Sequence, residues 1–218
     1  MTEHIDYPPK LRRTYILWAL IFVSVAVEIV LTVADYGIWG TGRWRSLAYQ
    51  NGGFWIGLLS GWRPNFGVQP YLMFVTYAFL HAGIVHLLVN MVTLVSLGLM
   101  VIPRIGQSRF LLLYFSSVLG GGGAFALLSD SIQPMVGASG ALFGLAGALA
   151  AWEYVDRFTA RLRLWPVLRL VLFLIALNLV LWWAMDGKLA WETHLGGFLA
   201  GWMFAFLIDP RPRPVDID

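Results

Sequence analysis

The sequence predicts an all-α, polytopic membrane protein: a bundle of six transmembrane helices with an interfacial first loop. Of its 218 residues, 59% are hydrophobic and only 12% are charged, and the mean hydropathy is +0.71. Soluble domains carry about 25% charged residues. The apolar residues are concentrated in six runs, and crossing a hydrocarbon core takes about 20 of them. Backbone in lipid must satisfy its own hydrogen bonds, so these runs are expected to be helices.

The six runs divide the chain into one membrane domain with two short tails. We place the tails at 1–14 and 209–218, and the helices at 15–34, 83–101, 110–128, 136–154, 165–185 and 191–208. The first two helices are separated by a long segment that is rich in glycine and contains Trp39, Trp44, Trp55 and Trp62. Tryptophan favours the headgroup level, so we interpret this segment, including the apolar stretch 71–80, as interfacial.

The basic residues indicate the orientation of the bundle. Eleven of the 15 Lys and Arg residues lie on the two tails, the second-to-third connection and the fourth-to-fifth connection with its flank. The positive-inside rule then places both termini in the cytoplasm, and we expect a multi-pass protein of a bacterial inner membrane. The basic residues form no continuous face, which argues against a nucleic-acid partner. Because the chain has no cysteine, thiolate nucleophiles and Cys-ligated metals are excluded.

This orientation places four polar residues at one depth. His86 and Asn90 fall in the first turns of the second helix, Ser139 opens the fourth helix and His194 lies near the start of the sixth. At 1.5 Å per residue they lie about 5 to 10 Å below the outer boundary. Ionisable side chains are costly in hydrocarbon, so this grouping indicates chemistry.

Ser139 has two interpretations. A serine at a helix N-terminus has free backbone N–H groups beside it, which can stabilise a developing oxyanion. Alternatively, it belongs to a stripe of small residues that lets two membrane helices pack closely. That stripe consists of Gly137, Gly140, Gly144 and Gly147.

His194 can serve as the base that a serine nucleophile needs, since its ordinary pKa lies near neutrality. It can equally be an interfacial hydrogen-bonding residue. Gly197 and Gly201 give its helix a Gly-x-x-x-Gly face. If this face packs on the glycines of the fourth helix, Ser139 and His194 meet.

His86 and Asn90 are spaced i, i+4 and therefore share a helix face. Both can donate a side-chain hydrogen bond to an oxyanion. His81 lies five residues before His86, about 140° away around the helix, and is expected at the loop–helix junction. The zinc pattern His-Glu-x-x-His is absent, so we expect neither a metal nor a cofactor.

Together these residues resemble the rhomboid intramembrane serine proteases, whose pattern is His-x4-His-x3-Asn, Gly-x-Ser-Gly and a late-helix His with glycines downstream. The matching residues are His81, His86 and Asn90, then Gly137 to Gly140 with Ser139, then His194 with Gly197 and Gly201. The resemblance implies a Ser139 nucleophile, a His194 base and an oxyanion hole from His86, Asn90 and the Ser139 backbone N–H. It also implies transmembrane-helix substrates, cleavage near the outer face, and the fifth helix as a side gate.

The sequence departs from the commoner family pattern at two places. Phe143 stands where a tyrosine often stacks on the catalytic histidine. Leu72 and Met73 replace a Trp-Arg pair, and the pair at Trp62 lies ten residues earlier.

Two further polar residues lie in predicted spans. We expect Glu28 to pair with a first-loop arginine or to lie in a wet crevice, with a role as third catalytic residue as the alternative. Asn178 is interpreted as an interhelical hydrogen-bonding residue.

The function predicted from these observations is a serine endopeptidase whose partners are transmembrane protein substrates and membrane lipid. The main alternative is a rhomboid-like protein that holds transmembrane clients without cutting them. A channel or small-solute transporter is a third possibility, although the sequence has no evident internal repeat.

Overall fold

The computed structural model describes residues 14–208, and the two predicted tails lie outside them except for Thr14. Within this range the regular secondary structure is helical, apart from one isolated bridge between Phe54 and Met135. The long helices are α1 (Tyr15–Asp35), α4 (Ile84–Ile105), α5 (Gln107–Leu128), α6 (Ser139–Thr159), α7 (Trp165–Ala184) and α8 (Trp191–Leu207). Each overlaps one predicted run, with ends that differ by up to five residues, so the all-α polytopic bundle is confirmed.

The prediction that all six long helices span the membrane is not confirmed. Among the described residues, four helices, α1, α4, α5 and α7, are long and apolar enough to cross a membrane. α8 has only 17 residues, and the buried face of α6 consists mostly of glycine and alanine. These two helices pack against each other inside the bundle, where small residues serve better than large apolar ones.

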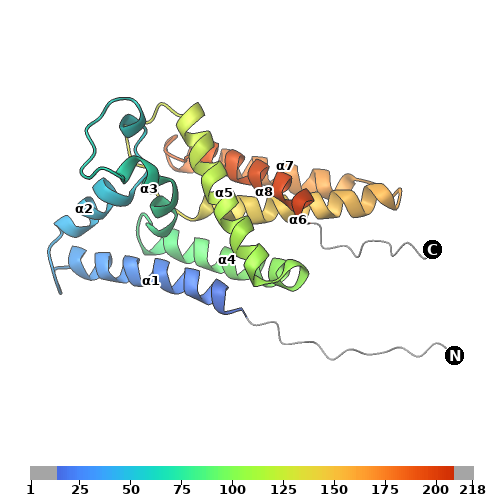
Figure 1. Cartoon of the computed structure of the whole chain (residues 1–218), viewed down its shortest axis with the longest axis horizontal. Coiled ribbons are helices and arrows are strands. Elements are labelled where there is room, and N and C mark those ends of the chain that lie inside the picture. The colour runs from blue at the N-terminus through green and yellow to red at the C-terminus, as the bar shows by residue number, and fades with distance from the viewer. Residues whose placement is uncertain (1–13, 209–218) are drawn as a thin grey trace.

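The centre of the bundle is the contact of α6 with α8, and α5 crosses both (Figure 1). A Cβ added at Gly197 would overlap the backbone carbonyl of Gly140, and one added at Gly201 would overlap that of Gly144. The two helices therefore meet backbone to backbone. The predicted packing between the glycine faces of the fourth and sixth helices is confirmed.

α7 contrasts with this centre. Only Val167 is buried among its twenty residues, all of which are described.

The start of α1 and the end of α8 lie at the same end of the bundle, as an even number of long helices requires (Figure 1).

The first loop gathers at the other end of the bundle (Figure 1). It contains α2 (Arg43–Gly52), the 3₁₀ turns η1 (Ile56–Leu59) and η2 (Tyr77–Phe79), and α3 (Gln69–Thr76). The stretch 71–80 therefore ends before the spanning helix, as predicted. Gly83 (φ +93°) makes the turn into α4, a backbone conformation that residues with a Cβ rarely adopt.

Arg45 of α2 fastens this loop to the bundle. Its guanidinium donates to both oxygens of Glu28 at 2.8 and 3.1 Å, to Asp35 at 2.6 Å and to the His81 carbonyl at 3.1 Å. The hydrogen bond with Glu28 holds the pKa of Arg45 above its ordinary value. The predicted pairing of Glu28 with a first-loop arginine is confirmed, and the paired carboxylate is 1% exposed. The first-loop arginine is Arg45, while Arg63 is exposed.

Candidate active site

Ser139 is the first residue of α6, and the chain leading to it is held at two points. The Gly137 N–H donates to the Tyr77 carbonyl at 3.0 Å, and Phe54 and Met135 exchange backbone hydrogen bonds at 2.9 and 3.0 Å. Because Ser139 opens its helix, its own N–H has no carbonyl one turn earlier to bond. The first loop thus fixes the position of the serine and leaves a backbone donor beside it.

Ser139 and His194 form a hydrogen-bonded pair. The Ser139 Oγ lies 2.8 Å from the His194 Nε2, and His194 is 4% exposed. The ring of Phe143 stacks on the imidazole, with centroids 4.2 Å apart and planes within 6°. The expectation that glycine packing would bring these two residues together is met. The ring expected over His194 is present without the hydroxyl of tyrosine.

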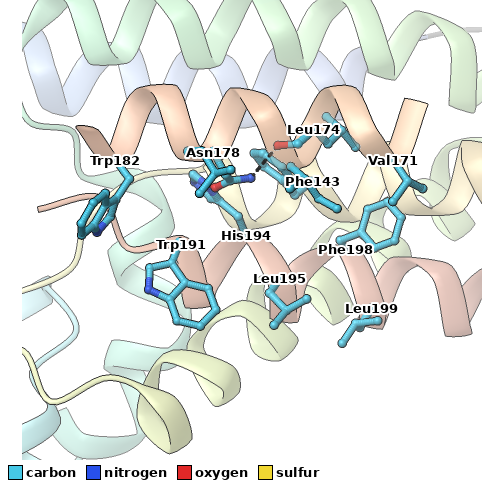
Figure 2. Close-up of a pocket in the computed structure, with 12 residues that line it drawn as sticks. Phe143, Val171, Leu174, Asn178, Trp182, Trp191, His194, Leu195, Phe198 and Leu199 are labelled. Atoms are coloured by element: carbon cyan, nitrogen blue, oxygen red, sulfur yellow. Dashed lines mark hydrogen bonds between the residues drawn. The ribbon is translucent and has the colours of Figure 1, made fainter. Parts of the chain in front are cut away.

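The other imidazole nitrogen is bonded to α7. The His194 Nδ1 lies 2.6 Å from the Asn178 Oδ1, while the Asn178 Nδ2 donates to the Leu174 carbonyl at 3.0 Å (Figure 2). A carbonyl only accepts, so this second bond fixes which end of the amide is oxygen. The oxygen then accepts from Nδ1–H, which leaves Nε2 as the acceptor for the Ser139 hydroxyl. Ser139, His194 and Asn178 are therefore aligned like a nucleophile, a base and an orienting residue.

His86 and Ser139 both lie beside Gly137. Its Nδ1 accepts from the Ala82 N–H at 3.2 Å, so a neutral ring carries its hydrogen on Nε2. A Cβ added at Gly137 would lie 3.0 Å from that Nε2 and 3.9 Å from the Ser139 Oγ. The His86 Nε2–H donor and the Ser139 Oγ therefore border the same narrow space in front of Gly137, which is about as wide as one small chemical group.

Asn90 and His81 lie beside His86 in different settings. Asn90 is 3% exposed and its amide donates to the His86 backbone carbonyl at 2.9 Å, so donation to an oxyanion stays a prediction. His81 is fully buried, with its ring edge-on to His86 at a centroid distance of 5.3 Å. Burial lowers the pKa of His81 to about 3. Its carbonyl accepts from Arg45 and Tyr49, which places His81 at the loop–helix junction, as expected.

Replacing Gly137 with alanine is expected to slow the reaction of Ser139 with a fluorophosphonate by about 100-fold. The methyl group would intrude on the space between His86 and Ser139, only 2.8 Å from the His86 Cε1, so the His86 ring must shift. A φ of +130° also disfavours any Cβ. Labelling rates of the purified variant measure the effect. Gly61→Ala is the matched control, because Gly61 also has a positive φ but faces open space. Equal labelling of the Gly137 variant and wild type would show that the space is not used.

An apolar cavity of about 530 Å³ opens between α7 and α8 and reaches this site (Figure 2). His194, Asn178 and Phe143 line it together with aliphatic and aromatic side chains of the two helices. The weak packing of α7 leaves this space.

The interhelical hydrogen bond expected of Asn178 is confirmed. Its partner, His194, is not among the expectations from the sequence. One signal could have found it: between 170 and 185 it is the one strongly polar residue. A lone amide in such a run needs a partner on a neighbouring helix.

Comparisons with known proteins agree with this geometry. The Rhomboid domain pattern matches residues 69–211. RHOMBOID-like protein 2 of Arabidopsis thaliana is 35% identical over 181 residues, which cover 80% of this chain and 48% of that protein. Rhomboid-like protease 3 of Toxoplasma gondii is 34% identical over 65% of this chain and 53% of that protein. Rhomboid protease GluP of Bacillus subtilis (strain 168) is 35% identical over 58% of this chain and 24% of that protein.

The matched region contains every residue of the candidate site. Ser139, His194, His86, Asn90 and Asn178 all lie between 69 and 211, whereas α1 and α2 precede it. The chain spans about half or less of the length of these relatives. Because the family pattern covers well over half of the chain, this multi-pass membrane protein belongs to the rhomboid family.

Proposed function

We propose that the protein is an intramembrane serine endopeptidase that cleaves transmembrane helices near the outer membrane face. The observation that carries the proposal is the 2.8 Å contact between the Ser139 Oγ and the His194 Nε2 within an apolar bundle. Two relatives named as proteases support the same activity.

The proposed reaction is acyl transfer in two steps. The Ser139 Oγ attacks the scissile carbonyl carbon while its proton passes to the His194 Nε2. The C–N bond then breaks, the amine leaves with that proton, and an acyl ester on Ser139 remains. A water molecule then gives a proton to His194 and attacks the ester carbon. The C–O bond to Ser139 breaks, and His194 returns the proton to the Ser139 Oγ. The Ser139 N–H and the His86 Nε2–H support the oxyanion from two sides, with Asn90 as a third candidate donor.

The preferred substrates follow from the backbone chemistry. A helix in lipid hides its carbonyls in its own hydrogen bonds, so attack requires a segment that has unwound. Small or helix-breaking residues near the outer end of a substrate helix supply such segments. The weakly packed α7 is the candidate gate for their entry.

The proposed orientation has both termini in the cytoplasm and the site near the outside. The protein has no cysteine, so single cysteines introduced at Arg63 and Arg161 can be labelled in intact cells. A membrane-impermeant maleimide is expected to label position 63 and not position 161. The bacterial plasma membrane stays a prediction, since relatives come from a plant, a protozoan parasite and a bacterium.

The test of the activity uses the full chain in liposomes with a labelled single-pass substrate. Mass analysis of the products should place the cut in the outer third of the substrate helix, and a fluorophosphonate should label Ser139. An intact substrate together with an unlabelled serine would favour the alternative, a protein that binds transmembrane clients without cutting them.

A further inference from the structure

α7 presents one half-buried polar side chain, Asn178, to the rest of the bundle, and this side chain contacts His194. The helix is otherwise apolar from 170 onward. We propose that Asn178 is a positioning residue that holds His194 in the tautomer able to accept the Ser139 proton. This inference rests on the proposed function, and it assigns a third residue and a third helix to the reacting pair.

The hydrogen bonds of Asn178 determine its effect. Its amide nitrogen is engaged by the Leu174 carbonyl at 3.0 Å, so its oxygen faces the His194 Nδ1 at 2.6 Å. An oxygen acceptor at this position favours the ring form with hydrogen on Nδ1. That form leaves a lone pair on Nε2 directed at the Ser139 hydroxyl.

The other groups around His194 do not offer this acceptor. Phe143 covers a face of the ring by stacking, and Ser139 is bonded at Nε2. Glu28, the other candidate for a third residue, has both oxygens engaged by Arg45. Without the Asn178 oxygen, Nδ1 would face the apolar cavity, where an N–H has no partner.

Loss of the oxygen therefore changes the chemistry rather than the fit of the substrate. A buried N–H without an acceptor is unfavourable, so the ring would shift toward the form with hydrogen on Nε2. In that form His194 donates to Ser139 and cannot take its proton. The expected effect is a lower kcat with little change in KM.

The test compares Asn178→Leu, Asn178→Ala and Val180→Ala in the full chain in liposomes. Leucine keeps the branched shape of asparagine with a somewhat larger side chain and removes the acceptor, while alanine removes the acceptor and most of the side chain. Val180 is 62% exposed on the same helix, so its variant controls for truncating a side chain of α7. We expect both Asn178 variants to lose about 10- to 100-fold in kcat with KM within threefold of wild type, and Val180→Ala to match wild type.

A second readout reports the tautomer directly. Histidine ring nitrogens labelled with ¹⁵N distinguish N–H from bare nitrogen by chemical shift, and the His194 signals can be assigned by their loss in His194→Gln. Wild type is expected to show hydrogen on Nδ1, and Asn178→Leu a shift toward Nε2. The proposal is overturned if Asn178→Leu keeps the wild-type kcat, or if its kcat falls while the His194 tautomer is unchanged.

The two readouts separate this inference from the proposed function. If wild type cuts no substrate, the proposed function fails, and the ring-nitrogen spectra still decide whether Asn178 sets the tautomer. If wild type cuts and Asn178→Leu cuts equally well, the protease assignment stands and the role of Asn178 is wrong.

Discussion

Substitution of Ser139 by alanine is expected to reduce cleavage of a transmembrane substrate by about 10⁴-fold or more, with substrate binding retained. The Ser139 Oγ is the hydroxyl within reach of the His194 Nε2, at 2.8 Å, and alanine leaves no nucleophile there. His194→Ala should give a loss of similar size, because an unactivated serine hydroxyl is a weak nucleophile. Single-turnover cleavage in liposomes measures both.

The double variant sharpens this expectation. If Ser139 and His194 act as one unit, removing both should cost no more than removing one. Ser117→Ala is the matched control, since Ser117 is a fully buried serine of the same bundle whose hydroxyl donates to the Leu113 carbonyl within α5. Cleavage by Ser139→Ala at the wild-type rate would rule out the proposed mechanism.

Substitution of Gly201 by alanine is expected to have the largest effect on stability, about 3 kcal/mol of the free energy of unfolding. The added Cβ would overlap the Gly144 carbonyl oxygen and its neighbouring backbone atoms. Backbone inside a helix cannot move aside as a flexible side chain can, so α8 must separate from α6. Unfolding by SDS titration in mixed micelles measures the change.

The matched control for Gly201 is Gly123→Ala on α5. A Cβ there would meet no atom within 4 Å, so the higher helix propensity of alanine should leave the protein as stable as wild type or slightly more stable. Because the α6–α8 contact also sets the distance between Ser139 and His194, Gly201→Ala should slow fluorophosphonate labelling as well. Wild-type stability of Gly201→Ala would show that the glycine contact is not required for folding.

The pairing of Ser139 with His194 was predictable because both helices carry their own spacing signals. Glycines at 140 and 144 on one helix and at 197 and 201 on the other define two narrow faces, and backbone contact between them fixes both rotation and depth. The Phe143 ring over His194 was anticipated from the family resemblance, and an arginine for Glu28 from the cost of an unpaired carboxylate in hydrocarbon.

The role of Asn178 was not predictable in this way. Apart from Arg169 near its start, Asn178 is the one strongly polar residue of α7, and a single residue does not indicate which side chain of a neighbouring helix it contacts. The choice of Arg45 over the other first-loop arginines had a similar cause, since it depends on α2 folding as a helix that returns over α1. The prediction of six spans rests on apolar runs alone. The glycine- and alanine-rich α6 and the short α8 are instead held in the bundle by packing against each other.

The attachment of Asn178 to α7 has a thermodynamic consequence. α7 has one buried residue, so little packing energy opposes its displacement, yet it holds a bond to the imidazole that Ser139 also contacts. Displacement of α7 and binding at Ser139 both act on the Asn178–His194 bond, so each event changes the free energy of the other by the same amount. A molecule wedged between α7 and α8 that stretches this bond must weaken binding at Ser139 of any compound that depends on it. Such a compound, once bound, must disfavour the wedge by the same factor, which makes α7 an allosteric element of the proposed enzyme.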